Sequence, residues 1–152
     1  MTGRVVSLQV VPGNHAEPRF VEEAAAIQGG GLQGDWHRKR GGRALLLMDA
    51  RDLRDLGLSP GDLREQITID LPGLMELPAG ARLRVGRAVL EITKPCEPCT
   101  HIGEHVGVGD VEAFRDHLRG RRGMLARFLE VDAASVIRMG DPVEVLAEER
   151  IT

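Results

Sequence analysis

The chain has very few aromatic side chains: its 152 residues include three Phe, one Trp and no Tyr. Proteins that bind single-stranded nucleic acid stack the bases on aromatic rings, so this scarcity argues against that class. The formal net charge of −3 gives no broad basic surface for duplex DNA either. We therefore expect no nucleic-acid partner and a core built from aliphatic residues.

Long apolar runs are also lacking. No stretch approaches the roughly 20 apolar residues of a membrane helix, and VVSLQVV near the amino end is not followed by the small-residue cleavage site of an export signal. The two cysteines, Cys96 and Cys99, are more often thiols than a disulfide in a protein that is not exported. The sequence therefore predicts a cytoplasmic protein without membrane attachment.

Gly and Pro divide the sequence into short β-rich segments, which favours a barrel or sandwich over a layered α/β sheet. Gly86-Arg87 separates two apolar runs and predicts a hairpin. The length and the lack of a linker or repeat predict one domain over residues 1–152. The expected strands are Arg4–Val11, Phe20–Ile27, Arg43–Met48, Gln66–Asp70, Arg82–Val85, Ala88–Thr93, Leu125–Leu129, Ser135–Met139 and Val143–Ala147.

Two helices are expected between these strands. Asp49 is placed to cap a helix that runs to about Leu56. Asp110 is placed to cap a second helix, which Gly120 ends. Apolar residues recur along the second helix at the spacing i, i+3, i+7, so we expect one of its faces to pack against the core.

A basic loop bounded by glycines is the first candidate site. Four cations fall within the six residues 38–43, and the flanking glycines permit tight turns. Guanidinium groups match the geometry of phosphate oxygens, so this loop is suited to hold an anion. A solvated basic loop is the equally weighted alternative. The charged residues of this segment are Asp35, His37, Arg38, Lys39, Arg40 and Arg43.

Two further segments, LSPGDLREQITID and GRRGMLAR, carry charges beside expected strands. In the first, Arg64 and Glu65 are most simply charges at a strand edge. In the second, Arg127 alternates with Leu125 and Leu129, so its guanidinium group shares their face of the sheet. An arginine on such a face needs an anionic partner, which is either a protein carboxylate or a ligand.

The Cys-x-x-Cys pair of KPCEPC allows several interpretations. A redox dithiol normally opens a helix, and Pro95, Pro98 and Gly103 argue against a helix start here. A structural zinc site needs four ligands, and no second Cys-x-x-Cys accompanies His101 or His105. The remaining interpretations are a single functional thiolate in a rigid loop and a pair of buried, inert cysteines.

Taken in order, five blocks resemble the MOSC family, named for the carboxy-terminal domain of molybdenum cofactor sulfurase. The match runs from about Gly3 to Leu146 and rests on GLQGDWH with GGRALLL, GLSPGDLREQI, LRVGRAVLEITKPCEPC, GRRGMLAR and MGDPVEV. The resemblance implies a small closed or partly closed β-barrel with two or three peripheral helices. It also implies binding of the molybdenum cofactor (molybdopterin) and of molybdenum ion, together with pyridoxal phosphate.

The resemblance implies that Cys99 is the central residue, as a ligand of molybdenum or a carrier of sulfur. Asp35 and His37 would be catalytic neighbours that orient groups or transfer protons. The implied cofactor-binding residues are Arg43, Arg64, Glu65, Arg121 and Arg127.

Three departures from the family pattern stand out. Gln66 replaces the usual asparagine, and an extra methylene in a tight site can displace the amide group. Cys96 stands where a basic residue is more usual, which keeps the dithiol interpretation open. The chain also lacks the amino-terminal β-barrel domain of well-defined molybdenum enzymes, so we expect weak cofactor binding or binding through a protein partner.

Two classes of function remain open at this point. In the first, the chain handles sulfur or the molybdenum cofactor, either as a persulfide carrier or as a reductase of N-hydroxylated compounds. Its partners would then be a small-molecule cofactor or a sulfur donor. In the second, the chain is a non-catalytic module that binds an anion or a protein, and Cys99 is a packed residue. A disulfide switch between Cys96 and Cys99 is a third hypothesis.

Overall fold

The structure is a computed structural model, and it describes residues 2–132 and 134–146. It contains short strands, three α-helices and two short 3-10 helices. The strands are β1 (Thr2–Val10), β2 (Arg19–Val21), β3 (Glu23–Ala25), β4 (Leu45–Asp49), β5 (Ile67–Asp70), β6 (Arg82–Val85), β7 (Ala88–Pro95), β8 (Met124–Glu130), β9 (Val136–Arg138) and β10 (Pro142–Val145). The helices are η1 (Gly41–Arg43), α1 (Ala50–Asp55), η2 (Leu74–Glu76), α2 (Thr100–Val106) and α3 (Val111–His117).

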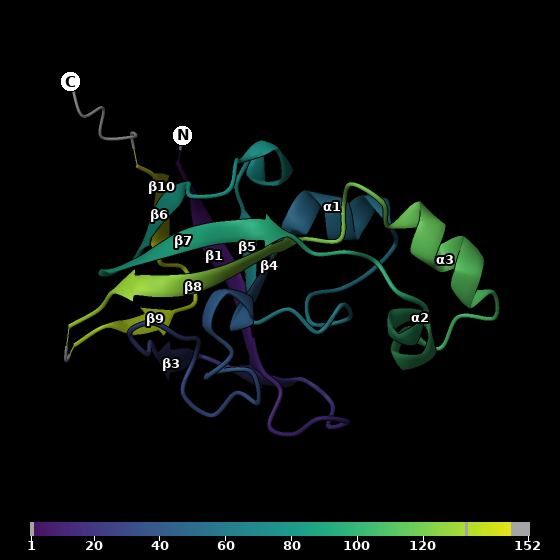
Figure 1. Cartoon of the computed structure of the whole chain (residues 1–152), viewed down its shortest axis with the longest axis horizontal. Helices are drawn as coiled ribbons and strands as arrows, with labels where there is room; N and C mark the ends of the chain where they lie inside the picture. The colour runs from purple at the N-terminus through teal and green to yellow at the C-terminus, as the bar shows by residue number, and fades with distance from the viewer. Residues whose placement is uncertain (1, 133, 147–152) are drawn as a thin grey trace.

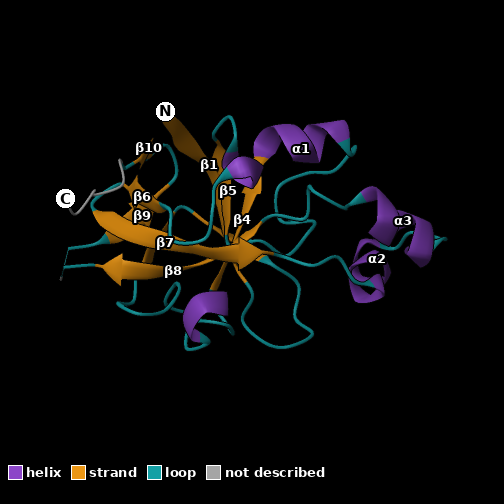
Figure 2. Cartoon of the chain, turned by 45° about the horizontal axis from the view of Figure 1, so that its top comes forward, coloured by secondary structure: helices purple, strands orange, loops and turns teal. Residues whose placement is uncertain are grey.

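Seven of the strands close into a barrel (Figures 1 and 2). Its order is β10-β6-β7-β8-β4-β5-β1, and β1 pairs with β10 to complete the circle. The β4–β5 pair is parallel and the other barrel pairs are antiparallel. β2 extends the sheet beyond β1, and β3 pairs with β9 in a separate two-stranded sheet. The predicted mostly β barrel with peripheral helices is therefore confirmed.

The apolar residues form two separate clusters. The larger one fills the barrel and includes Leu45, Leu47 and Phe128, all of which are fully buried. The smaller one includes Leu53 of α1 and Ile102 of α2, and it lies under the helices. Figure 1 shows α2 and α3 together at one end of the molecule, beyond the ends of β7 and β8. The barrel and this helical end thus each pack around an apolar cluster of their own.

The hairpin and both predicted helix caps are confirmed. β6 and β7 pair across Gly86, whose φ of 58° is a conformation that glycine adopts readily. The Asp49 side chain accepts a hydrogen bond from the backbone of Arg51 at the start of α1. Asp110 likewise accepts one from the backbone of Ala113 at the start of α3.

The prediction that no helix begins after Cys99 is wrong, because α2 begins at Thr100. Pro98 precedes the capping residue, so its missing N–H is not needed for a helical hydrogen bond. Gly103 is tolerated because α3 packs closely against it. A Cβ at this position would lie 3.1 Å from side-chain atoms of Val108 and Val111.

Several strand boundaries also differ from the predicted ones. The single strand expected over Phe20–Ile27 is two strands, β2 and β3, that belong to different sheets. Arg43 lies in η1, and β4 begins at Leu45. The expected strand Ser135–Met139 is the shorter β9, and Val143–Ala147 corresponds to β10, with residue 147 outside the described residues.

Candidate functional site

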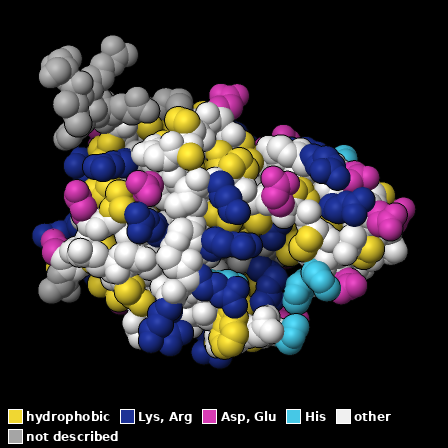
Figure 3. Space-filling model, in the orientation of Figure 1, with side chains coloured by type: hydrophobic (Ala, Val, Ile, Leu, Met, Phe, Trp, Pro, Cys, Tyr) yellow, Lys and Arg dark blue, Asp and Glu magenta, His cyan; other side chains and the backbone are white. Residues whose placement is uncertain are grey.

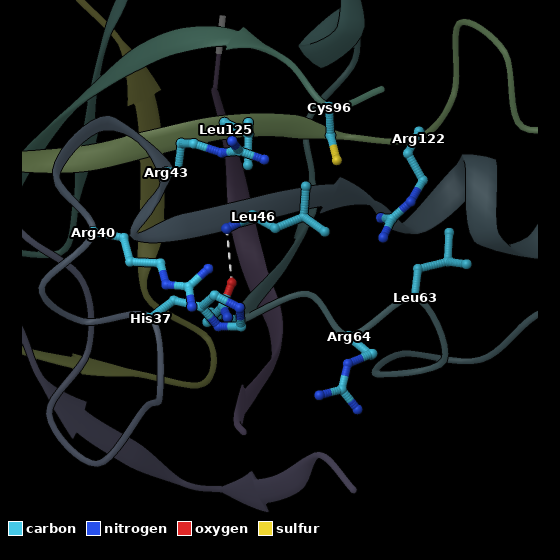
Figure 4. Close-up of a pocket in the computed structure, with 10 residues that line it drawn as sticks. His37, Arg40, Arg43, Leu46, Leu63, Arg64, Cys96, Arg122 and Leu125 are labelled. Carbon is cyan, nitrogen blue, oxygen red and sulfur yellow. Dashed lines mark hydrogen bonds between the residues drawn. The ribbon is translucent and has the colours of Figure 1, made fainter. Parts of the chain in front are cut away.

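A cavity of about 190 Å³ opens on the outside of the barrel, where the wall formed by β4 and β8 meets the helical end. Figure 3 shows Lys and Arg side chains gathered around a hollow in the middle of this face, with histidines at its border. The side chains around the cavity are shown in Figure 4. The lining residues are His37, Arg40, Arg43, Leu46, Leu63, Arg64, Gln66, Cys96, Arg122 and Leu125.

Two leucines from neighbouring strands form the apolar part of the lining. Leu46 of β4 and Leu125 of β8 are directly opposite each other in the antiparallel register. Side chains alternate along a strand, so Leu46 points away from the barrel interior, which Leu45 and Leu47 fill. The leucine pair therefore gives the cavity a rigid wall that belongs to the barrel itself.

The loop before β4 contributes His37, Arg40 and Arg43, as the basic motif predicted. Tight packing of this loop depends on glycine. A Cβ at Gly30 would lie 2.2 Å from the backbone oxygen of Arg38, and a Cβ at Gly31 would lie 2.7 Å from that of Ala44. Only glycine fits where backbones approach so closely, and this folding turns the cations toward the cavity.

Asp35 is fully buried and holds the loop in place through hydrogen bonds. Its carboxylate accepts hydrogen bonds from the backbone of Val11 at 2.7 Å and of His37 at 2.9 Å. The ring Nδ1 of His37 lies 3.4 Å from Asp35 Oδ2. Burial alone would raise the pKa of Asp35, but hydrogen bonds from His37, Val11 and Gln66 hold it below the ordinary value. Asp35 is therefore an ionised group that positions its neighbours.

Gln66 links this loop to the barrel. Its amide nitrogen donates to both Asp35 oxygens, at 3.3 and 3.2 Å, and its amide oxygen accepts from the backbone of Leu46 at 2.7 Å. The last of these bonds is drawn in Figure 4. Gln66 also lines the cavity, so its longer side chain is compatible with a place in the cavity wall.

Arg64 has an unusual backbone conformation, with φ at 63°, in the region that favours glycine. Its Nη1 donates to the backbone oxygen of Ala16 at 2.8 Å, and its Nη2 donates to that of Asn14 at 3.1 Å. Burial lowers the pKa of Arg64, and Arg122 lowers it further while Asp35 opposes this. A guanidinium group nevertheless stays charged in proteins.

Arg122 is the most buried cation of the cavity, with 8% of its surface exposed. Its Nε and Nη1 atoms are buried and have no hydrogen-bond partner. The adjacent Gly123 has φ at 102°, and a Cβ there would lie 2.6 Å from the backbone oxygen of Leu47. Because Gly123 has no Cβ, the start of β8 packs closely against the backbone of β4. The preceding Arg122 side chain then points into the cavity. Basic residues were predicted in this block, but as Arg121 and Arg127.

The two cysteines lie in different environments, and both are free thiols. Cys96 is half-buried and lines the cavity, and Figure 4 shows its sulfur pointing into it. Its backbone N–H donates to the oxygen of Gly123 at 2.9 Å, which anchors it beside Arg122. Cys99 is exposed at the start of α2 and is not among the lining residues. The chemical role predicted for Cys99 stays a prediction.

Three other predicted residues lie away from the cavity lining. Glu65 is fully buried, and its Oε2 accepts from the backbone of Gly61 and the hydroxyl of Thr68. Arg121 donates to the backbone oxygen of His117 at the end of α3. Arg127 lies 3.5 Å from Glu91, its cross-strand neighbour, so its anionic partner is a protein carboxylate.

Arg40 was named among the cations of the basic loop, but Arg122 was not predicted as a site residue. No sequence signal distinguishes Arg121 from Arg122, because the direction of each side chain depends on the turn at Gly123. Within residues 2–132 and 134–146, no group of three or more His, Cys, Asp or Glu side chains is placed to hold a metal ion. No described helix is long and apolar enough to cross a membrane.

A comparison with protein families finds the MOSC domain over residues 35–144. Among solved structures, the chain is similar to the YuaD protein from Bacillus subtilis, with 18% identity, coverage of 98% of both chains and a TM-score of 0.83. It is also similar to YiiM from Geobacillus stearothermophilus, with 16% identity, coverage of 95% of this chain and 75% of that one, and a TM-score of 0.74. YiiM from Escherichia coli gives 19% identity, coverage of 98% and 71%, and a TM-score of 0.65. No curated protein matches the chain.

Proposed function

Because the chain belongs to the MOSC domain family, we propose that it binds the molybdenum cofactor through the cofactor's anionic, phosphate-bearing end in the arginine-lined cavity. The observation that carries this proposal is the state of Arg122. Its Nε and Nη1 atoms are buried without a hydrogen-bond partner, although it lines a cavity. A buried charge without a partner costs free energy, and an anion in the cavity supplies the partner.

The other lining residues fit the same group. Arg40, Arg43 and Arg64 add guanidinium groups, and no carboxylate of the described residues forms an ion pair with any of them. Arginine is suited to phosphate because its planar fork presents two donors at once. The cavity, at about 190 Å³, is smaller than the ~300–1,000 Å³ of sites that enclose a whole ligand. It therefore suits one end of the cofactor.

The sulfur of Cys96 completes the arrangement. A soft thiolate is the protein ligand that suits molybdenum or sulfane sulfur, and Cys96 is the cysteine that lines the cavity. When bound, the cofactor supplies redox or sulfur chemistry that the side chains themselves lack. The arginines offset the charge of thiolate and phosphate together, while Asp35 holds His37 and Gln66 at the edge of the cavity.

The proposal does not extend to pyridoxal phosphate. Enzymes hold that cofactor as a Schiff base with lysine, and neither Lys39 nor Lys94 lines the cavity. We also propose a cytoplasmic location, since both cysteines are free thiols and reducing compartments keep thiols in that state.

The test is the molybdenum content of protein made in cells that synthesise the cofactor. Arg122→Gln and Cys96→Ser should lose most of the metal per chain. Arg127→Gln and Cys99→Ser, which alter residues outside the lining, should keep the wild-type amount. Absence of molybdenum from the wild type contradicts the proposal. Loss in Cys99→Ser with retention in Cys96→Ser would return the ligand role to Cys99.

The alternative is a non-catalytic module that binds an anionic metabolite in the same cavity. The same arginines would be required, but neither cysteine would matter. Anion binding that survives in both cysteine variants, in a wild type without molybdenum, would favour this module.

A further inference from the structure

A buried carboxyl group, that of Glu65, lies behind the wall of the arginine cavity and has no part in the proposed function. None of its surface is exposed. The residues on either side of it in the sequence, Arg64 and Gln66, both line the cavity, whereas Glu65 does not. Charges interact strongly through a protein interior because its dielectric constant is low. An ionisable group in this position therefore responds to the charge of whatever the cavity binds.

The hydrogen bonds of the Glu65 side chain are confined to one of its two oxygens. Oε2 accepts from the backbone N–H of Gly61 at 3.1 Å and from the hydroxyl of Thr68 at 2.8 Å. The Thr68 hydroxyl in turn accepts from the amide nitrogen of Gln9 at 3.3 Å, which fixes its direction. Oε1 is buried and has no hydrogen-bond partner among the described residues. The ionised form of Glu65 thus lacks donors at Oε1, and this oxygen is free to hold a proton.

Asp35 shows that a buried carboxylate in the same region can be held in the opposite way. Both of its oxygens accept hydrogen bonds from backbone N–H groups and from Gln66, and these bonds outweigh burial and keep its pKa below the ordinary value. Burial instead raises the pKa of Glu65, against fewer hydrogen bonds. Asp35 is therefore a constant negative charge, and Glu65 is the carboxyl group whose protonation can change near neutral pH.

Arg122 is the charged side chain that links Glu65 to the cavity. Its positive charge favours the ionised form of Glu65, and its own Nε and Nη1 atoms are buried without hydrogen-bond partners among the described residues. The groups that Glu65 contacts through hydrogen bonds are uncharged, and they belong to Gln9 of β1, Gly61 of the preceding loop and Thr68 of β5. An anion bound to Arg122 brings a negative charge toward Glu65, and a nearby like charge favours the neutral form of a carboxyl group.

We propose that Glu65 takes up a proton when an anion binds to Arg122, so that the cavity binds an anion and a proton together. This inference rests on the proposed function, since it requires an anion in the arginine cavity. The proton comes from solvent, is held at Oε1 and leaves when the anion is released. Neutral Glu65 no longer repels the bound anion, so anion binding weakens as the pH rises and Glu65 must ionise.

The test is a calorimetric titration of sulfate into the protein in buffers of different ionisation enthalpy, repeated at several pH values from mildly acidic to neutral. Sulfate carries two negative charges throughout this range and takes up no proton itself. The dependence of the apparent enthalpy on the buffer gives the number of protons bound per anion. In wild type this number should pass through a maximum of at most about one proton, and Glu65→Gln should lose that maximum. Glu91→Gln alters a carboxylate beside Arg127, outside the cavity lining, and should behave like wild type.

Two additions separate Glu65 from other effects. Histidine also exchanges protons near neutral pH, and His37 lines the cavity, so the comparison is repeated in a His37→Gln background, where Glu65→Gln should still reduce proton uptake. The second addition uses the wild type alone. The carbon-13 NMR signal of the Glu65 carboxyl group should titrate at a higher pH with saturating sulfate than without it.

Equal proton uptake by wild type and Glu65→Gln would overturn the inference, and so would a Glu65 carboxyl signal whose titration sulfate does not shift. Arg122→Gln separates this failure from failure of the proposed function. Sulfate binding that Arg122→Gln weakens, without proton uptake by Glu65, removes the coupling alone. Absence of sulfate binding, or binding that Arg122→Gln leaves unchanged, removes the coupling and the anion site together.

Discussion

Arginines on the outer surface of the protein and arginines that line the cavity differ in the partners of their guanidinium groups. Outside, they face carboxylates at distances of 3.1 to 3.7 Å. In the cavity they have no carboxylate partner among the described residues, although Arg122 is buried and a lone buried charge is costly. The outer pairs are Arg84–Glu144, Arg87–Asp132, Arg127–Glu91 and Arg138–Glu23.

The difference in partners suggests different roles for the two groups of arginines. An exposed ion pair contributes only about 0–1 kcal/mol to the free energy of unfolding. The outer arginines therefore form ordinary surface ion pairs. None of the cavity arginines forms an ion pair with a carboxylate of the described residues, although the charges of Asp35 and Glu65 act on Arg64 and Arg122. Asp35, the nearest buried carboxylate in the loop, is instead occupied by backbone N–H groups and Gln66. The cavity thus keeps its positive charge available for a ligand.

The largest expected effect concerns the glycine that directs Arg122 inward. Gly123→Ala should lower the free energy of unfolding by about 3 kcal/mol or more, because it combines a positive φ with a clash against the backbone of Leu47. Gly120→Ala is the matched control. Its φ is 77° but its added Cβ would meet nothing within 4 Å, so a loss of about 1 kcal/mol is expected. Equal losses in urea unfolding would contradict this account.

The next largest effect on the free energy of unfolding is expected from removal of the buried charge of Arg122. Without anion, Arg122→Met should raise the free energy of unfolding by about 1–2 kcal/mol, since it removes a guanidinium group with unpartnered atoms. Arg127→Met should instead leave stability unchanged or slightly lower. Urea unfolding in phosphate-free buffer measures both. Destabilisation by Arg122→Met would mean that Arg122 serves the fold and not a ligand.

The free energy of unfolding should depend on pH through the titration of Glu65. Burial raises the pKa of Glu65, and the charge of Arg122 opposes that rise. A group with a raised folded pKa loses stability as pH rises from its ordinary value, 4.5, through the folded value. Glu65→Gln should therefore gain stability over wild type as pH rises in that window, with a constant difference below it.

The same titration distinguishes Arg122 from the outer arginines. In an Arg122→Met background the pKa of Glu65 should rise further, so the gain from Glu65→Gln should begin at the same pH, near the ordinary value, but continue to a higher pH and reach a larger total. An Arg127→Met background should leave the curve unchanged. Urea midpoints measured across pH report both, and a gain from Glu65→Gln that does not vary with pH would be the contrary result.

The smallest effect is expected for the outer pairs. A double-mutant cycle of Arg127→Gln and Glu91→Gln should give a coupling energy of about 0–1 kcal/mol that shrinks at high salt. Neither variant should alter anion binding. A coupling well above this range would show that the outer pair is more than a surface contact.

Local signals in the sequence predicted most of the fold. The turn at Gly86 fixed the β6–β7 hairpin, and Asp49 and Asp110 fixed the starts of α1 and α3. α2 was missed because Pro98 and Gly103 argue against a helix locally. The close packing of α3 over Gly103, which explains that glycine, is a tertiary contact.

The site was predictable only in part, for a similar reason. The glycine-bounded loop was a candidate site in the sequence, and its residues His37 and Arg43 line the cavity. The Arg121-Arg122 pair and the Cys96–Cys99 pair each present two chemically identical candidates. Which member faces the cavity depends on the turn at Gly123 and on the start of α2, and composition does not encode either direction.

The most direct test of the central claim is a calorimetric titration of inorganic phosphate into the protein at constant ionic strength. Wild type and Arg127→Gln should show one saturable site per chain with the same affinity. Arg122→Gln should bind at least about tenfold more weakly, a difference of about 1.4 kcal/mol. Equal affinity in all three proteins, or no saturable binding by the wild type, would contradict the claim that the cavity arginines are kept unpaired for an anion.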